Sequence, residues 1–382
     1  MKALRVSLGE VLTRIKRPVE INGEDQYAEV GVYCFGRGLF HKPARSGLEV
    51  GDKALFVIQE GDFILQTTFA WEGAVAVAAQ RDNGMFGSVR VLTFEPDRSK
   101  CNPKYLQLYL STPHGREQLL RISPGSAGRN RVLNIKRLPE VTIPLPALPQ
   151  QDQLVRQTQA IATRLAELRR LRQEIQDDAK ALLHSVFHRL IQGAEYRPLA
   201  KVAPIVRRPV ELDLDETYEE IGIRSFHKGV FFKCLSLGAD ISHKSMFQMV
   251  PGDLAFSNIM AWEGGIAVVR PEDQGRIGVH RFITCVPRAG VADAHFLWFY
   301  FQTGPGFEKI VAASPATIAR NRTLSVKRLE SIEVPVPTYE KQQEFSALQA
   351  KVAAIHQAQA ANQAELDALL PAVLDKAFKG EL

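Results

Sequence analysis

Apolar and polar residues alternate in short runs through most of the chain. The runs YAEVGVYCF from Tyr27 and DFILQTTF from Asp62 are bounded by Gly, Asp and Asn, which are typical of turns between β-strands. KYLQLYLST from Lys104 has apolar residues at helical spacing, and the prolines of EVTIPLPALP from Glu140 rule out a helix there. We therefore expect an α+β fold with a curved or partly closed antiparallel sheet over residues 1–148.

Two segments, residues 150–192 and 341–378, follow a helical period instead. The first contains neither Pro nor Gly, and both place apolar residues seven apart, as in a coiled-coil seam. The seam residues are Leu154, Ile161, Leu168, Ile175 and Leu182 in the first segment and Phe345, Val352, Leu366 and Val373 in the second. A helix of about 40 residues is about 60 Å long. We expect the two helices to form an antiparallel coiled coil that holds the globular parts apart. The alternative is that each helix packs back on its own domain.

The chain repeats itself with a constant offset. FAWEGAVAV at Phe69 and MAWEGGIAV at Met260 lie 191 residues apart, half of the 382-residue length. RPVEI at Arg17 matches RPVEL at Arg208 with the same offset, and RNRVLNIKRL matches RNRTLSVKRL. Two copies of one fold favour packing with approximate two-fold symmetry.

The repeat and the helical segments together predict four domains. They are a first β-rich domain over residues 1–148, a helix over 149–193, a second β-rich domain over 194–338 and a helix over 339–382.

Charge and cysteine content narrow the function classes only slightly. The net charge is +6, with 48 basic and 42 acidic residues, which is compatible with a polyanionic partner but does not establish one. The four cysteines include no CxxC pair, which argues against a zinc site and suits a reducing cytoplasm. No apolar run approaches the length of about 18 residues that a membrane span needs.

The order of the motifs resembles a known family. An AWEG segment, then RN-x-x-L from Arg129, then P-x-P from Pro144, then a Gln-rich helix start at Pro149 all recur in the second half. This pattern is similar to the specificity subunit of Type I restriction–modification systems. The resemblance implies two target recognition domains, each of which reads one half of a bipartite target in double-stranded DNA. It also implies spacer helices that dock DNA methyltransferase subunits, with two expected, and a restriction/translocase subunit that joins this complex.

The same resemblance implies a cytoplasmic, non-catalytic subunit that serves DNA methylation and host defence. We expect no catalytic residues, no cofactor, no metal and no membrane partner.

Candidate DNA-binding residues fall into two groups. Arg and Asn suit contacts to phosphates and bases, and one group recurs in both copies, which favours phosphate positioning; it comprises Arg129, Asn130, Arg131, Arg320, Asn321 and Arg322. The other group differs between the copies where contact loops are expected, and comprises Arg37, His41, Lys42, Arg45, Lys228, Lys233, His243, Lys244, Ser257 and Asn258.

Three other patterns do not favour a functional site. The Trp-Glu pairs that begin at Trp71 and Trp262 precede apolar strands, so a structural role is favoured although Glu accepts hydrogen bonds from cytosine. FGRG at Phe35 is too weak a signal for a cofactor loop. His184 and His188 lie on one helical face without a third metal ligand.

Two alternative functions remain open. One is a pseudo-symmetric coiled-coil scaffold for protein interactions, which would lack salt-dependent DNA affinity. The other is a site-specific DNA enzyme with an unrecognised active site, which an activity assay on the isolated chain would detect.

Overall fold

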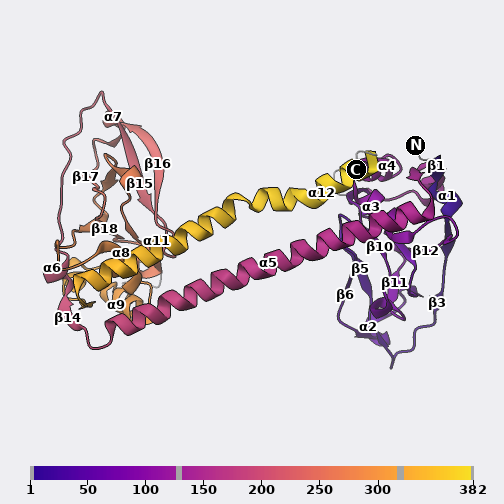
Figure 1. Cartoon of the computed structure of the whole chain (residues 1–382), viewed down its shortest axis with the longest axis horizontal. Coiled ribbons are helices and arrows are strands. Elements are labelled where there is room, and N and C mark those ends of the chain that lie inside the picture. The colour runs from indigo at the N-terminus through magenta and orange to yellow at the C-terminus, as the bar shows by residue number, and fades with distance from the viewer. Residues whose placement is uncertain (1–3, 126–130, 316–321, 380–382) are drawn as a thin grey trace. The chain divides into compact units, whose positions relative to one another are not determined.

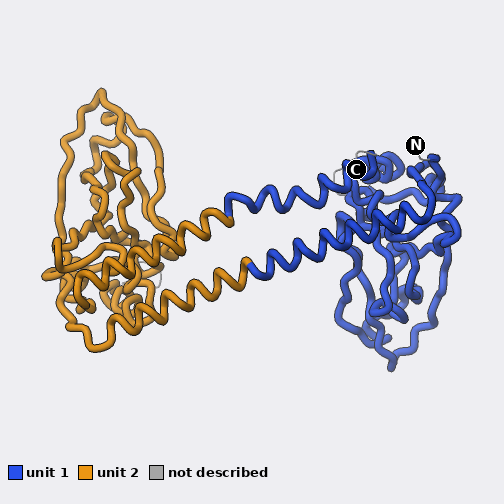
Figure 2. Tube along the Cα trace, viewed as in Figure 1, with its two compact units in different colours: residues 1–171, 360–382 blue, residues 172–359 orange. Residues whose placement is uncertain are grey.

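The computed structural model describes residues 4–125, 131–315 and 322–379. The chain forms two compact units: residues 1–171 with 360–382 make unit 1, and residues 172–359 make unit 2 (Figure 2). The division falls within helix α5 (Leu148–Ile191) and near the end of helix α11 (Tyr339–Ala361). Each unit therefore contains one globular part and one stretch of paired helices.

Unit 1 is built on short, mainly antiparallel strands (Figure 1). Its largest sheet has the order β10-β9-β12-β2, with strands Val75–Val77, Phe63–Gln66, Val91–Pro96 and Leu12–Ile15. A second sheet has the order β11-β8-β3, with strands Phe86–Ser88, Leu55–Val57 and Pro18–Val19. The two-stranded sheets pair β1 (Leu4–Ser7) with β13 (Thr142–Leu145), β4 (Gln26–Tyr27) with β7 (Arg45–Ser46), and β5 (Val30–Val32) with β6 (Leu39–His41). The globular helices are α1 (Leu8–Val11), α2 (Gly47–Val50), α3 (Pro103–Ser111), α4 (Pro113–Arg121), η1 (Ala70–Glu72), η2 (Gln80–Asp82) and η3 (Ile135–Glu140).

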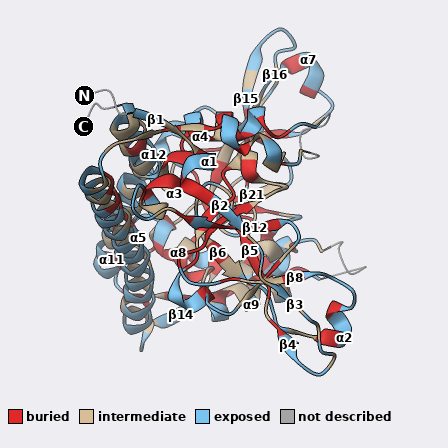
Figure 3. Ribbon diagram, turned by 90° about the vertical axis from the view of Figure 1, so that its right-hand side faces the viewer, coloured by how far each residue is buried: buried red, intermediate tan, exposed pale blue. Residues whose placement is uncertain are grey.

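Unit 2 has a related set of sheets. One has the order β16-β15-β20-β17, with strands Val230–Leu237, Thr217–Ile223, Ile277–Val279 and Met246–Gln248. The others are β19-β18-β21, with strands Ile266–Val268, Leu254–Ser257 and Phe282–Cys285, and the pair β14 (Glu195–Pro198) with β22 (Glu333–Val336). Its helices are α6 (Leu199–Val202), α7 (Gly238–Ile241), α8 (Ala294–Tyr300), α9 (Gly304–Ala313), α10 (Val326–Glu330), η4 (Ala261–Glu263) and η5 (Pro271–Asp273). The β15–β16 hairpin, with α7 at its tip, carries many exposed residues (Figure 3).

The sequence repeat is also a structural repeat. Strand β9 begins at Phe63 and β18 at Leu254, and helix α1 begins at Leu8 and α6 at Leu199, so both pairs keep the offset of 191. The RPVE motif has the same role in each copy. Arg17 forms a two-pronged ion pair with Asp62, at 2.6 and 3.1 Å, and Arg208 forms the equivalent pair with Asp253. Both carboxylates are buried, so in each domain the arginine neutralises a negative charge that would otherwise be unpaired.

The Gln-rich helix starts supply one buried glutamine each. The Gln151 side chain accepts from Asn102 N at 2.8 Å and donates to the carbonyls of Lys100 and Pro146. Gln342 repeats this: it accepts from Asp293 N at 2.9 Å and donates to the carbonyls of Val291 and Pro337. Each glutamine thereby satisfies backbone groups at the junction of helix and domain, where no water reaches them.

The far end of each helix docks through an aromatic ring. In unit 2, Phe187 near the end of α5 packs against Phe296 and Phe299 of α8 and against Phe345 of α11. In unit 1, Phe378 near the end of α12 (Gln363–Lys379) packs against Tyr105 and Tyr109 of α3, each with ring centroids 5.2 Å apart. Phe187 and Phe378 also lie 191 residues apart.

Within each unit the two helices run antiparallel, as the heptad pattern predicts (Figure 1). In unit 1, Arg169 of α5 pairs with Asp367 of α12 at 2.7 Å, while Phe378 reaches the domain in which α5 begins. In unit 2, Gln176 contacts Gln359, and Phe187 contacts Phe345. Each helix therefore begins on one globular part and ends on the other.

The predicted seam is confirmed only in part. Phe345, Val352 and Leu165, which continues the stripe of the first helix, are buried, whereas Ile175 and Leu182 are each 48% exposed. Midway along α5 the contacts with the partner helix are polar, because Arg172 donates to the carbonyl of Gln359 and Gln176 to its side chain.

The prediction of one continuous second helix is wrong. A turn at Asn362 separates α11 from α12, and α12 contains Pro371, which cannot donate an intrahelical hydrogen bond. None of the helices in the described residues is long and apolar enough to cross a membrane.

Phe378→Ala should destabilise unit 1, and Phe187→Ala should destabilise unit 2. Removing the buried ring of Phe187 costs about 3–5 kcal/mol, and removing the partly buried ring of Phe378 costs less. Hydrogen–deuterium exchange is expected to accelerate in α3 for the first variant and in α8 for the second. Ile175→Ala, at an exposed position, is the control and should change neither; equal exchange in all four proteins would contradict the docking role.

Gln342→Ala should lower the melting temperature, because it leaves Asp293 N and two carbonyls buried without partners, at about 1–3 kcal/mol. Gln343→Ala, at the exposed neighbouring position, provides the matched control. Differential scanning calorimetry measures both, and indistinguishable thermograms would show that the buried glutamine is dispensable.

Candidate nucleic-acid interface

A groove of about 440 Å³ opens in unit 1 beside the β5–β6 strand pair. It combines the side-chain types that read and hold nucleic acid: cations, aromatic rings, and hydroxyl and amide groups. These residues are Arg37, Lys42, Arg90, Tyr33, Phe40, Gln66, Thr68 and Ser88. The groove brings together two of the predicted site residues, Arg37 and Lys42.

Of the four basic residues predicted between positions 37 and 45 of the first copy, three are tied to buried carboxylates. His41 Nε2 lies 2.7 Å from Asp82, Lys42 Nζ lies 3.4 Å from Glu29, and Arg45 also pairs with Glu29. Arg37 differs, because it is exposed and its Nε donates to the carbonyl of Cys34 at 3.1 Å. Within the described part of the chain, Arg37 has no carboxylate partner and is the cation of this set most available to a phosphate.

The second copy repeats this arrangement around Glu220. Lys233 Nζ lies 2.7 Å from this buried carboxylate, and the Ser236 hydroxyl also donates to it. Burial alone would raise the pKa of Glu220, but the hydrogen bonds from Lys233 and Ser236 outweigh it and hold the pKa below its ordinary value. Lys244 adds a weaker electrostatic contribution of the same sign. Lys233 is therefore part of the domain's internal charge balance, as Lys42 is in the first copy.

Lys228 and His243 are exposed in the second copy. The Lys228 ammonium lies 6.0 Å from the ring centroid of Phe226, and His243 follows the short helix α7. Lys228 occupies the position equivalent to Arg37. Arg37 and Lys228 are thus equivalent cations, and neither has a carboxylate partner among the described residues.

Ser257 and Asn258 are placed differently from each other. Ser257 is 3% exposed, so this geometry does not present it to DNA. Asn258 is half-buried, and its side chain donates to the carbonyl of Leu324 at 3.4 Å. In the first copy Gln66, equivalent to Ser257, accepts a hydrogen bond from the backbone of Val32.

The repeated basic stretch is only partly described. Arg129, Asn130, Arg320 and Asn321 lie outside the described residues. Arg131 donates to the carbonyl of Ser123 at 3.3 Å, and the Arg322 guanidinium lies 5.6 Å from the ring centroid of Trp262.

The AWEG segments hold the turns of the neighbouring hairpins. Phe35 N donates to the carbonyl of Glu72 at 2.9 Å, and Phe226 N donates to that of Glu263 at 2.7 Å. Both phenylalanines have a left-handed backbone, with φ of 62° and 59°, which is unusual for a bulky residue. The Glu72 carboxylate accepts from the Cys34 thiol, whose pKa is raised to about 11, mainly by burial. The structural role favoured for the Trp-Glu pairs accounts for these contacts.

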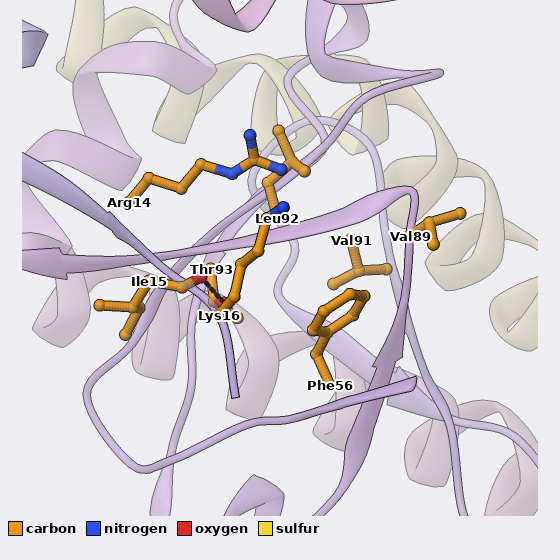
Figure 4. A pocket seen from close by; sticks show the side chains of 8 residues that line it. All are labelled: Arg14, Ile15, Lys16, Phe56, Val89, Val91, Leu92 and Thr93. Carbon is orange, nitrogen blue, oxygen red and sulfur yellow. Dashed lines mark hydrogen bonds between the residues drawn. The ribbon is translucent and has the colours of Figure 1, made fainter. Parts of the chain in front are cut away.

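A smaller cavity of about 120 Å³ adjoins the groove of unit 1, and Val91 lines both (Figure 4). Arg14 and Lys16 lie at its edge above the apolar side chains of Phe56 and Val91, and the Thr93 hydroxyl donates to the carbonyl of Ile15 at 3.0 Å. None of the predicted site residues lines it. The described residues contain no cluster of three or more His, Cys, Asp or Glu side chains that could hold a metal ion.

Sequence reasoning missed Tyr33 and Phe40 in the groove. Their signal was available in the repeat, because Arg224 and Phe231 stand at the same offset of 191. Tyr33 was passed over because an aromatic residue in a β-rich run is more often part of a core.

Comparisons with known proteins agree with this picture. Residues 5–177 match the family described as the Type I restriction modification DNA specificity domain. No curated protein sequence matches the chain.

Two solved structures share the fold over nearly the whole length. The HsdS subunit from Thermoanaerobacter tengcongensis is 21% identical with a TM-score of 0.65, and the match covers 100% of this chain and 97% of that one. A chain from a structure titled as the basis of complex assembly and conformational transition of the type I R-M system is 20% identical, with a TM-score of 0.68 and coverages of 99% and 98%. At these identities the likeness establishes the fold.

The family match ends at residue 177, but the remaining half repeats the same motifs and elements at a constant offset. The scaffold and the DNA enzyme are consequently not favoured. The first half of this chain thus matches the Type I restriction modification DNA specificity domain, and the second half repeats that half's motifs on a fold shared with two solved specificity-system structures.

Proposed function

We propose that the chain reads a bipartite target in double-stranded DNA, with one half-site for each globular part. Residues 1–148 and 194–338 are the target recognition domains, and residues 149–193 and 339–382 are the spacer helices. The observation that carries the proposal is the duplication of a domain whose first copy matches the specificity family. Major grooves on one face of B-DNA recur every ~34–36 Å, so the length of the helices would set the distance between half-sites.

The contacts to DNA divide into positioning and reading. Arg37 and Lys228 keep a positive charge at one position in both copies and are exposed, which suits phosphate binding. Arg131 and Arg322 belong to the repeated basic stretch and support the same assignment. Lys42, Arg45 and Lys233 are better placed to shape the domain, because buried carboxylates already pair with them.

The helices are proposed to bind two DNA methyltransferase subunits, through which a restriction/translocase subunit joins. In unit 2, Ile175 and Leu182 lie seven residues apart on one face of α5, and each is 48% exposed. Exposed apolar side chains in a row on a helix favour a protein partner. The solved relative described in the context of type I R-M complex assembly supports this direction.

The chain is proposed to bind without doing chemistry and to act in the cytoplasm. The match to the specificity family supports the first statement, since base methylation and DNA cleavage would belong to the partner subunits. The four cysteines are unpaired, which suits a reducing compartment.

Deleting this chain alone from a host that also carries its methyltransferase partner should remove one split, asymmetric methylated motif from the methylome. Methylome sequencing measures this, with the partner's expression verified and re-expression of the chain as the control. A methylome that is unchanged by the deletion would refute the proposed function.

Ile175→Glu should weaken binding of the methyltransferase subunit about tenfold or more, since it places a charge in an apolar contact. Lys180→Glu on the same helix is the control for a change of charge. Co-purification and titration calorimetry measure the association, and wild-type affinity in the Ile175→Glu variant would remove this face of α5 from the interface.

A further inference from the structure

We infer that Tyr33 and Arg224 are equivalent base-reading positions, and that Arg224 selects guanine in the half-site bound by the second recognition domain. The inference rests on the proposed function of the chain as a DNA reader. It concerns equivalent residues of the β5–β6 and β15–β16 strand pairs: a glycine, the residue two positions after it, and the phenylalanine opposite.

Both copies have the same cross-strand pair of a glycine and a phenylalanine at this place. Gly31 pairs with Phe40 across β5 and β6, and Gly222 pairs with Phe231 across β15 and β16. The phenylalanine ring lies directly over the glycine in each copy, so that a Cβ atom on either glycine would collide with the ring. The absence of a side chain at Gly31 and Gly222 is thus what leaves room for the ring to approach the strand this closely.

The residue two positions after the glycine points to the same face and rests on the ring. The Tyr33 ring centroid lies 4.7 Å from that of Phe40, with the planes at 43°. The Arg224 guanidinium carbon lies 4.9 Å from the ring centroid of Phe231. The position in the strand pair and the supporting phenylalanine are therefore the same in the two copies. Only the residue that rests on the phenylalanine ring differs.

Arg224 is available to a ligand. It is exposed, and no ion pair joins it to a carboxylate within the described residues. This contrasts with Lys233 on the same hairpin, which Glu220 holds at 2.7 Å. A cation left free but held in one plane by an aromatic ring is prepared for directional hydrogen bonds.

The chemistry of the two side chains predicts different bases. A guanidinium donates two parallel hydrogen bonds, which match O6 and N7 of guanine in the major groove. Tyr33 offers one hydroxyl group and a ring and cannot form that fork. The half-site read by the second domain should therefore require a guanine that the first domain does not require at the equivalent place.

The surrounding cations support a division between residues that read bases and residues that bind phosphates. Tyr33 lines the groove of unit 1 together with Arg37 and Arg90. The equivalents in the second copy are Lys228 and Arg281. These two positions therefore stay basic, while the residue that rests on the phenylalanine ring changes. Constant charge suits the phosphates, which are the same in every sequence, and the variable residue suits the bases.

The test is methylome sequencing of hosts that express the methyltransferase partner with the wild-type chain, with Arg224→Tyr or with Tyr33→Arg. Arg288→Tyr, at an exposed position in the second domain, is the matched control. We expect Arg224→Tyr to relax one guanine position of one half-site, with methylation of the sites newly accepted rising about tenfold or more. Tyr33→Arg should alter one position of the other half-site, and Arg288→Tyr should change neither.

Each other outcome has one meaning. A wild-type motif retained by both variants overturns the inference but leaves the proposed function intact. A wild-type chain that confers no motif refutes the proposed function itself. If Arg224→Tyr gives no methylation, Arg224→Gln decides: a shift from guanine toward adenine supports the inference. Uniform loss at all sites, in a variant that circular dichroism shows to be folded, would assign Arg224 to phosphate binding and overturn it.

Discussion

The structure depends on two phenylalanine side chains, Phe187 and Phe378, that fasten the far end of each long helix. A helix of this length has an apolar stripe too long for one small domain to cover, and the middle of the α5 contact surface is polar where Arg172 and Gln176 meet α11. Attachment therefore depends on the two ends. At the near end a buried glutamine, Gln151 or Gln342, satisfies the backbone. At the far end an aromatic ring, Phe187 or Phe378, packs against aromatic residues of the other globular part.

The two globular parts share a set of buried contacts and differ in exposed side chains. The shared set consists of the ion pairs Arg17–Asp62 and Arg208–Asp253, the buried carboxylates Glu29 and Glu220, and the AWEG segments that hold left-handed turns. A bulky residue with positive φ costs of order 1–3 kcal/mol. Both copies keep such a residue at the same turn, so the backbone of this turn is conserved between them although the hairpins differ in length.

The repeat let the sequence predict the fold class, the duplicated domain and the paired helices. It could not predict the whole seam, because Ile175 and Leu182 fit a heptad as well as the buried residues Leu165 and Val352 do, and only the partner helix decides between them. The turn at Asn362 was missed because single residues between good helix formers give a weak signal. Among candidate contacts, Lys42 and Lys233 were indistinguishable from Arg37 in sequence, since their carboxylate partners lie on neighbouring strands that only the fold brings together.

The division of unit 1 between residues 1–171 and 360–382 has a consequence for biosynthesis. The ribosome makes the first globular part before the second, yet Phe378, the ring that completes the first part's aromatic cluster, is translated after the second part. Unit 2 is continuous from residue 172 to 359, and Phe187 is already present when its core forms. The domain that emerges first is therefore finished last, and until then the surface around Tyr105 and Tyr109 lacks its cover. The nascent chain would need protection at that place for as long as the second half takes to be made.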